Sequence, residues 1–204
     1  MIRTLILTLA LSTPVLAQAP VAPTPVPTTA TAPKADIVHV TLTTAEGPIV
    51  LVLDRGRAPK TAANFLRYVD GRRFDGTAFY RAMKIGDGLG LVQFGTSNDP
   101  KRTYPPIAHE PTTQTGLTHT DGAISMAMAA PGTAAGDIFI IVGDLHTLDA
   151  TAEQPGFAAF GRVVEGMDVV RRILTAPTSP TKGEGVMRGQ MLEPTIKVQT
   201  ARRD

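Results

Sequence analysis

Apolar residues recur with a strand-like pattern in two neighbouring stretches near the start of the folded part of the chain. Residues 37–43 alternate apolar and polar positions, and residues 49–53 form a continuous apolar run. Between them lies Glu46-Gly47, which is typical of a tight turn. Period-two alternation indicates a strand with one buried face, so the two stretches predict a β-hairpin.

The apolar period then changes from that of a strand to that of a helix. Pro59 is tolerated in the first turn of a helix, and Gly71 is a natural end. Between them, apolar side chains recur at i, i+3, i+4 and i+7, which gives a core-facing stripe made of Ala62, Phe65, Leu66 and Val69. A second helix is predicted for residues 165–176, with its inner face formed by Val169, Val170 and Ile173.

Further short apolar runs predict the remaining strands: two within 79–95, one carrying Arg81 and one carrying Gln93, and four more at 123–128, 138–142, 157–164 and 195–198. Residues 96–121 are polar and rich in turn residues, which predicts a long loop of the kind that often forms a binding surface. About eight strands and two helices without a βαβ rhythm favour a mainly β fold. We predict a closed antiparallel eight-stranded β-barrel capped by two α-helices, because closure removes exposed edges.

One stretch, Phe79 to Gly95, combines two predicted strands with an unusual pair of polar side chains. Arg81 lies in the first apolar run, Gln93 lies in the second, and a loop with three glycines joins the runs. A hairpin of this kind places Arg81 and Gln93 side by side on the sheet surface. An arginine among apolar neighbours is either exposed to solvent or has partners for its donors.

The first 34 residues differ in composition from the rest of the chain. Residues 1–17 carry one cation, a short apolar run and a small-residue ending, which is the layout of a secretory signal peptide. We expect cleavage after Ala17 or Ala19, export to the periplasm, and no membrane span afterwards. An uncleaved anchor is the alternative. Residues 18–34 are rich in Pro, Ala and Thr and predict a disordered linker before a domain at 35–204.

Composition excludes several functional classes. The chain has no cysteine, which rules out disulfides, thiolate zinc sites and a thiol nucleophile. The net charge is only +2 and the basic residues are scattered, so we expect no nucleic-acid partner.

The sequence does not support two other chemistries, a metal site and a serine nucleophile. The four histidines do not have the spacing of metal ligands, so we expect neither a metal nor a cofactor. Ser125 lacks the glycine-flanked turn of a hydrolase nucleophile, and the sequence assigns it neither a histidine nor an acid partner.

Six motifs in order make the chain resemble the cyclophilin family of peptidyl-prolyl cis/trans isomerases over about residues 37–200. They are Pro-Lys-Thr-Ala-Ala-Asn-Phe at 59–65, Phe-Tyr-Arg at 79–81, Gln93 before Gly95, Ile-Ser-Met-Ala at 124–127, Gly-Asp-Ile-Phe-Ile at 136–140, and Phe-Gly-Arg-Val-Val-Glu-Gly-Met at 160–167. With its leader, the chain is most similar to the periplasmic bacterial branch.

The resemblance implies roles for particular residues. Arg81 corresponds to the catalytic arginine of the family, and Gln93 to the glutamine that supports it. The floor of the proline pocket corresponds to Phe139, and Ala127 would offer its backbone to the substrate. Further substrate-binding positions are Met126, Leu91, Leu148, Asp137, Met128 and Phe157. Met126 and Met128 face opposite ways on a strand, so only one lines the pocket, and the family pattern favours Met126.

Three departures from the family pattern affect the expected activity. The connection between Arg81 and Gln93 is about four residues longer, and one pocket aromatic is missing from it. Asp137 replaces a frequent glutamine and could either hold Arg81 or occupy the donors that a substrate needs. Thr147 stands where a tryptophan is associated with cyclosporin binding, so we expect weak cyclosporin affinity.

The chemistry that the resemblance implies needs no cofactor. Rotation about an X-Pro bond returns the lone pair to the prolyl nitrogen, and a fixed guanidinium aimed at that nitrogen stabilises the twisted state. We therefore expect a monomeric isomerase that acts on proline-containing segments of unfolded or exported proteins. The alternative is a binding or chaperone-like module that holds such segments without turnover.

Overall fold

The computed structural model describes residues 36–204. The predicted leader at 1–17 and the predicted linker at 18–34 lie outside these residues. Among the residues described, no helix has the length and apolar character needed to cross a bilayer.

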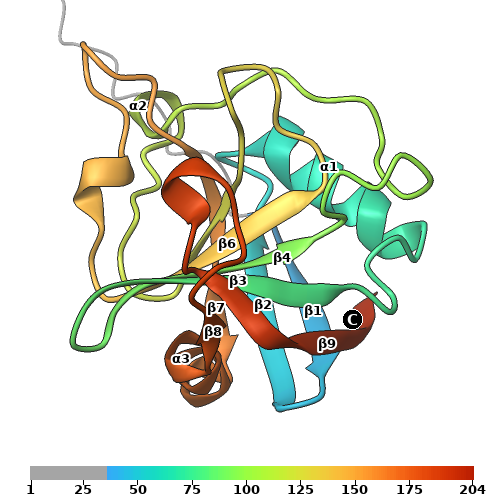
Figure 1. Ribbon diagram of the computed structural model, residues 1–204. Helices are drawn as coiled ribbons and strands as arrows, with labels where there is room; N and C mark the ends of the chain where they lie inside the picture. Colours follow the sequence, from blue (N-terminus) through green and yellow to red (C-terminus); the bar gives the residue numbers. More distant parts are fainter. Residues whose placement is uncertain (1–35) are drawn as a thin grey trace, which may run out of the picture. The chain divides into compact units, whose positions relative to one another are not determined.

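Eight antiparallel strands form a closed barrel (Figure 1). Around the barrel the strands follow the order β1 (Ile37–Thr44), β2 (Gly47–Asp54), β7 (Ala158–Glu165), β5 (Ala123–Met126), β6 (Asp137–Val142), β4 (Leu89–Gly95), β3 (Ala78–Gly86) and β9 (Met191–Arg203). Pairing of β9 with β1 closes the ring. A short ninth strand, β8 (Thr178–Ser179), pairs with β9 outside it. The predicted eight-stranded barrel is confirmed.

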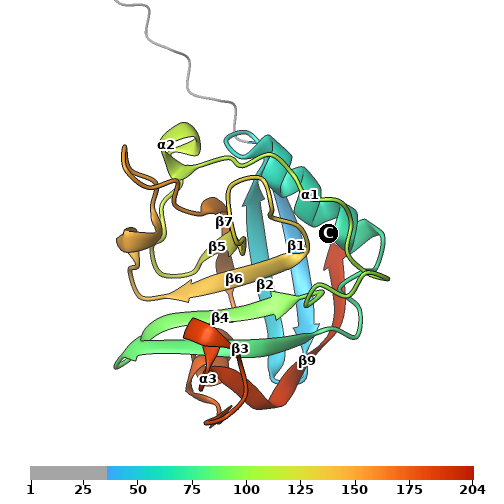
Figure 2. The same cartoon turned by 45° about the horizontal axis from the view of Figure 1, so that its top comes forward.

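Two amphipathic helices cover the barrel at opposite sides (Figure 2). Helix α1 (Pro59–Asp70) and helix α3 (Met167–Thr175) both bury the apolar stripes that their sequences predict. A third helix, α2 (Thr112–Thr115), is a single turn in the long loop, too short to show a period. Two 3₁₀ turns complete the described elements, η1 (His146–Leu148) and η2 (Gly185–Met187).

The long loop is attached to the start of α1 by a buried carboxylate. Helix α1 has no capping side chain of its own at Ala58. Instead Glu110, which is fully buried, accepts hydrogen bonds from the backbone N–H of Lys60 (3.1 Å) and of Thr61 (2.7 Å). The Thr61 hydroxyl donates a third, at 2.7 Å. Free N–H groups at a helix N-terminus favour an anion, so this contact fixes the loop against the helix.

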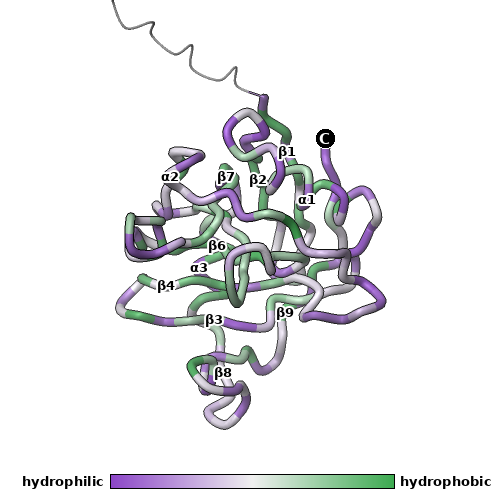
Figure 3. Tube along the Cα trace, turned by 90° about the horizontal axis from the view of Figure 1, so that it is seen from above, coloured by the Kyte–Doolittle hydropathy of each residue, from purple (hydrophilic) through white to green (hydrophobic). Residues whose placement is uncertain are grey.

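The interior of the barrel is filled by aliphatic and aromatic side chains. Figure 3 shows apolar stretches running along the strands, with polar residues gathered in the connections. Five phenylalanines are fully buried there, namely Phe65, Phe74, Phe79, Phe94 and Phe160. Phe79, Phe94 and Phe160 point inward because side chains alternate between the two faces along a strand. Phe65 comes from α1, and Phe74 comes from the turn that follows this helix.

The β3–β4 hairpin has the pairing that the sequence predicts. Its turn is Asp87-Gly88, where Gly88 takes a positive φ of 65°, a conformation that favours glycine. Arg81 of β3 lies directly opposite Gln93 of β4. The extra residues between them lengthen the hairpin beyond the body of the sheet.

Several strand ends differ from the predictions by one or two residues, and the differences at β5 and β9 affect the site. Strand β5 ends at Met126 and not at Met128, because the chain turns away after the Ala127 N–H donates to the Asp137 carbonyl (2.9 Å). Strand β9 covers Met191–Arg203 and so is much longer than the predicted 195–198. Its exposed polar positions, which pair at the barrel closure, hide the strand pattern from the sequence.

Candidate functional site

A single cross-strand row carries the polar and aromatic residues of the site. The residues paired across the sheet are, in order, Met191 of β9, Arg81 of β3, Gln93 of β4, Phe139 of β6 and Ser125 of β5. Residues in register across neighbouring strands share a face of the sheet. The barrel therefore places the predicted cation, amide and aromatic ring beside one another on its outer face.

Two glutamines hold the Arg81 guanidinium in place. Its Nε–H donates to Gln190 Oε1 at 2.8 Å, and its Nη1 donates to Gln93 Oε1 at 3.0 Å. Nη2 makes a weak contact with the Met83 sulfur at 3.6 Å. Among the residues that the structure describes, one N–H on Nη1 and one on Nη2 have no acceptor. These two donors are available to a substrate.

Tyr80 and Asp137 fix the orientation of the Gln93 side-chain amide. Its Nε2 donates to the Tyr80 hydroxyl at 2.7 Å, and that hydroxyl donates to Asp137 Oδ1 at 2.9 Å. A carboxylate only accepts, so the Tyr80 proton must point at Asp137 and the Tyr80 oxygen must accept from Gln93. Consequently the carbonyl oxygen of Gln93 faces Arg81. The chain of bonds orients the group that holds the cation.

Asp137 does not pair with Arg81, which answers the question that the sequence left open. Its carboxylate, only 8 % exposed, accepts from Tyr80 and from the backbone N–H of Ser97 (2.8 Å). Burial raises the pKa of Asp137, and the bonds from Ser97 and Tyr80 oppose that shift. Asp137 therefore does not occupy the two Arg81 donors that remain free.

The carboxylate of Asp137 also fixes the rim of the site. Ser97 and Asn98 both have positive φ, 48° and 57°, which is costly for residues with a side chain. The bond from Ser97 N to Asp137 holds the backbone in this turn. Beside them, a Cβ at Gly95 (φ 145°) would lie 2.2 Å from the Gly136 carbonyl, so this close approach of two strands requires glycine.

Burial shifts the ionisation of two further groups in this network. Burial raises the pKa of the Tyr80 phenol far above its usual value, and the neighbouring Asp137 adds to the shift. The hydroxyl therefore keeps its proton and remains a donor. Burial lowers the pKa of Arg81, yet a guanidinium stays charged at neutral pH because its ordinary pKa is so high.

Three aromatic rings pack together at the apolar end of the site. Phe139, 3 % exposed, is the floor, and Phe157 meets it edge-on with ring centroids 5.3 Å apart. His119 stacks behind Phe139 at 5.9 Å. Leu91 and Leu148 pack into the same cluster. The floor is thus fixed from two sides.

A cavity of about 950 Å³ joins this apolar end to Arg81. Nearly all of the substrate-site residues predicted from the sequence line it, namely Arg81, Gln93, Leu91, Ala127, Met128, Asp137, Phe139, Leu148 and Phe157. Its size lies within the range of small-molecule and peptide sites. The cavity therefore has hydrogen-bond donors at one end and an apolar hollow at the other.

The prediction that Met126 lines the pocket is wrong in position. Met126 is fully buried in the barrel core and pairs with Ile138, another core residue. Ser125 lies in the outer-face row, so its neighbour Met126 must point inward. Met128, which the chain places beyond the end of β5, lines the cavity instead. Ala127 also lines it, and its N–H is already bonded to Asp137, so only its carbonyl can meet a substrate.

Several cavity residues were missed by the sequence analysis. They are Tyr80, Met83, Ser97, Asn98, Ala129, Thr133, Ala135, Val186, Met187 and Met191 on the lining, with Gln190 bonded to Arg81. Tyr80 lies inside a quoted motif, and its polar hydroxyl beside Arg81 was an available signal. Residues 186–191 show no period that predicts a contact with a strand some hundred residues earlier.

A buried Ser125–His119–Asp149 chain lies beneath the floor. His119 Nε2 lies 2.9 Å from Ser125 Oγ, and His119 Nδ1 lies 2.6 Å from Asp149 Oδ1. This supplies the partners that the sequence could not assign to Ser125. Both Ser125 and His119 are fully buried, so no substrate reaches the hydroxyl. The arrangement supports the ring of Phe139 and cannot act as a hydrolytic triad.

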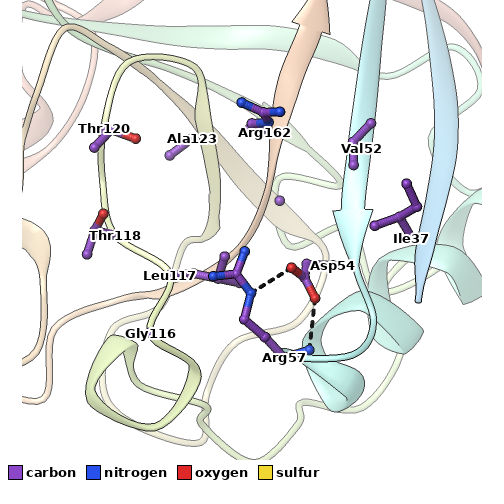
Figure 4. Close-up of a pocket in the computed structure, with 11 residues that line it drawn as sticks. Ile37, Val52, Asp54, Arg57, Gly116, Leu117, Thr118, Thr120, Ala123 and Arg162 are labelled. Atoms are coloured by element: carbon purple, nitrogen blue, oxygen red, sulfur yellow. Dashed lines mark hydrogen bonds and ion pairs between the residues drawn. The ribbon is translucent and has the colours of Figure 1, made fainter. Parts of the chain in front are cut away.

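A second cavity, of about 430 Å³, lies beside β2 and β7 (Figure 4). Arg57 at its edge is paired with Asp54, with Nε and Oδ2 2.7 Å apart. Arg162 and the threonines Thr118 and Thr120 complete its polar lining. None of these groups is buried in a directed network like that of Arg81. Within residues 36–204, no cluster of three or more His, Asp or Glu side chains could hold a metal ion.

Comparison with known proteins agrees with this geometry. The family described as cyclophilin type peptidyl-prolyl cis-trans isomerase/CLD matches residues 39–200. The chain is 37% identical over 145 residues to a peptidyl-prolyl cis-trans isomerase of Acinetobacter baylyi, covering 69% of this chain and 73% of the relative. It is 38% identical over 143 residues to peptidyl-prolyl cis-trans isomerase A of Dickeya dadantii, with the same coverage of 69% and 73%.

A solved structure shares the fold at low sequence identity. The cyclophilin type peptidyl-prolyl cis-trans isomerase of Cryptosporidium parvum superposes with a TM-score of 0.67 at 19% identity, covering 82% of this chain and 98% of that one. The family match over residues 39–200 includes every residue that lines the cavity around Arg81. The chain therefore belongs to the family of cyclophilin-type peptidyl-prolyl cis-trans isomerases.

Proposed function

We propose that this protein accelerates cis/trans isomerisation of X-Pro bonds, with Arg81 as the catalytic residue. The observation that carries the proposal is the Arg81 guanidinium, held by Gln93 and Gln190 with donors left free beside the apolar floor of Phe139. The relatives named as isomerases support it.

The reaction is accelerated by a hydrogen-bond donor that faces the prolyl nitrogen while the X-Pro bond rotates. The barrier of about 18–20 kcal/mol reflects the share of the nitrogen lone pair in the amide C–N bond. As the bond twists, the lone pair returns to the prolyl nitrogen, which then accepts a hydrogen bond. Arg81 offers that bond to the twisted state more strongly than to either planar isomer, and this difference lowers the barrier.

The rest of the cavity positions the substrate. The pyrrolidine ring packs on Phe139 between Leu91, Leu148 and Phe157, out of water. The Ala127 carbonyl accepts an N–H of the extended peptide chain. The carbonyl before the proline is then the part that rotates, because the ring is the part that is held.

We also propose that the protein acts on exported chains in the periplasm, as a monomer. The support is the leader-like pattern of residues 1–17 and the Pro-rich segment that follows it. Uncatalysed prolyl isomerisation takes tens to hundreds of seconds, so acceleration benefits proteins that fold after export. Cell fractionation and N-terminal sequencing of the mature protein test this part.

The alternative, a module that binds proline segments without turnover, requires that Asp137 and the altered 84–91 loop disable the site. The carboxylate is instead used by Tyr80 and Ser97, which favours the enzyme. Exchange NMR with an Ala-Pro-containing peptide separates the two. Faster exchange between cis and trans peaks on adding the protein supports catalysis, and binding shifts without faster exchange support the module.

A further inference from the structure

The segment that follows helix α3 adds an apolar surface to the cavity. Val186, Met187 and Met191 line the cavity, and Met191 is paired with Arg81 on the side away from Phe139. Met83 of β3 lines the same cavity and touches the Arg81 guanidinium. We call these four residues the apolar shelf. Val186 is 86% exposed and Met187 is 37% exposed. They are adjacent, and they account for two of the five large apolar side chains that are exposed in the described residues.

The shelf is held in place by backbone bonds. The turn at η2 is closed by bonds from Met187 N to Glu184 O (3.0 Å) and from Gln190 N to Met187 O (3.1 Å). The Gln190 side chain donates to the Val186 carbonyl at 2.8 Å. Its backbone carbonyl accepts from Ala82 N at 2.9 Å. The shelf is thus fixed to the strand that carries Arg81, and a ligand would bind there without a large ordering cost.

Isolated exposed apolar residues are common on protein surfaces, so exposure alone does not mark a site. Here the exposed residues continue without interruption into a cavity that already holds the reactive group. The shelf includes three methionines, whose flexible side chains adapt to differently shaped apolar groups. A shelf of this composition is better suited to bind substrate side chains of different shapes than to bind one defined ligand.

The spacing of the strands indicates which part of a substrate reaches the shelf. Met191 and Arg81 are paired on neighbouring strands, which lie about 4.8 Å apart. An extended peptide covers that distance in one to two residues, at about 3.3 Å per residue. With the prolyl nitrogen at Arg81, a side chain within two residues of the proline therefore lies over the shelf.

We propose that the shelf is a specificity site that selects prolyl substrates with a large apolar or aromatic residue within two positions of the proline. The proposal rests on the isomerase function proposed above and names its substrate class. Segments of this kind are buried in folded proteins and exposed only in chains that have not yet folded. The shelf would direct the enzyme to them.

A phenylalanine scan tests the proposal. Phenylalanine is placed in turn at the second and first positions before and after the proline of an otherwise alanine-rich peptide. Exchange NMR measures kcat/KM for the protein and for a double variant, Val186→Ser with Met187→Gln. Arg188→Gln, in the same segment, is the control. At one position we expect about a tenfold higher kcat/KM than for the alanine peptide, a gain that an added apolar contact typically supplies.

In the double variant kcat/KM for the phenylalanine peptide should fall to the value for the alanine peptide, whereas the control should keep the gain. Equal kcat/KM values for phenylalanine at all four positions, or a gain that survives in the double variant, would overturn the proposal. Titration of the same peptides against methyl-labelled methionines gives a second readout, with shifts expected at Met187 and Met191 and none at Met126. If no peptide is isomerised, the proposed function fails, and the titration still decides whether the shelf binds.

Discussion

The Gln190 side-chain carbonyl accepts a 2.8 Å hydrogen bond from Arg81 Nε, although the two residues are 109 positions apart in the chain. Gln93 holds the same guanidinium at Nη1. Two bonds on different nitrogens fix a planar group against rotation, so its free donors keep one direction. The segment after α3 thus takes part in orienting the proposed catalytic residue.

Replacement of Gln190 by alanine should lower kcat while the protein stays folded. A hydrogen bond to a charged group contributes about 1.5 kcal/mol, so we expect kcat to fall roughly tenfold. Peptide affinity should change little, because Gln190 does not line the apolar floor. Exchange NMR measures the rate and titration measures the affinity. Arg188→Ala, in the same segment and exposed, is the control. An unchanged kcat in Gln190→Ala would show that Gln190 does not position Arg81.

The Tyr80 hydroxyl should matter for rate because it sets the amide orientation of Gln93. In Tyr80→Phe the amide can turn its N–H groups toward Arg81, and we expect a loss in kcat of about tenfold, the value of one bond to a charged group. Asp137→Asn is the matched control, because its amide oxygen can accept from both Tyr80 and Ser97. Activity near the original level in Asp137→Asn and a loss in Tyr80→Phe would support the directed chain. Full activity in Tyr80→Phe would contradict it.

The barrel was predictable because its strands are bounded by clear turns and its helices have strong periods. The pairing of Arg81 with Gln93 followed from the hairpin alone. The cavity wall formed by 186–191 could not be predicted, because its contacts join residues far apart in sequence and its apolar residues follow neither a strand nor a helix period. Met126 was misplaced because the family pattern was followed at a position where the strand's own alternation sends the side chain inward.

Acid should destabilise the fold through His119. Burial lowers the pKa of His119, and its bond to Asp149 only partly opposes this. A histidine with a lowered folded pKa contributes full stability above its unfolded pKa of about 6.5 and loses it below, because only the unfolded chain takes up the proton. The loss is at most about 1.4 kcal/mol per pH unit for one proton.

Urea unfolding at pH 7.5 and pH 5.5 checks this prediction. The free energy of unfolding of the unmodified protein should fall more between these pH values than that of His119→Gln, which cannot titrate. Asp137, whose pKa is raised by burial, acts in the opposite direction, but it is common to both proteins and cancels in the comparison. Identical pH dependence in the two proteins would show that His119 does not carry the effect.

Glu110 should stabilise the protein without affecting the active site. In Glu110→Ala the N–H groups of Lys60 and Thr61 and the Thr61 hydroxyl lose their acceptor in a buried place. We expect a loss of about 2–3 kcal/mol in the free energy of unfolding, the cost of leaving buried donors unpaired. Urea unfolding measures it, and kcat at a temperature where the variant is folded should be unchanged. A loss below ~0.5 kcal/mol, the size of an ordinary surface substitution, would mean that the loop is not held by this carboxylate.

The central claim is that the free Arg81 donors stabilise the rotating X-Pro bond. The most direct measurement is the cis/trans exchange rate of a bound Ala-Pro peptide by NMR, with the protein and with Arg81→Ala at matched occupancy. We predict that Arg81→Ala binds the peptide through the intact Phe139 pocket and accelerates exchange at least ~100-fold less, as for loss of a transition-state donor. Equal acceleration by the two folded proteins would contradict the account.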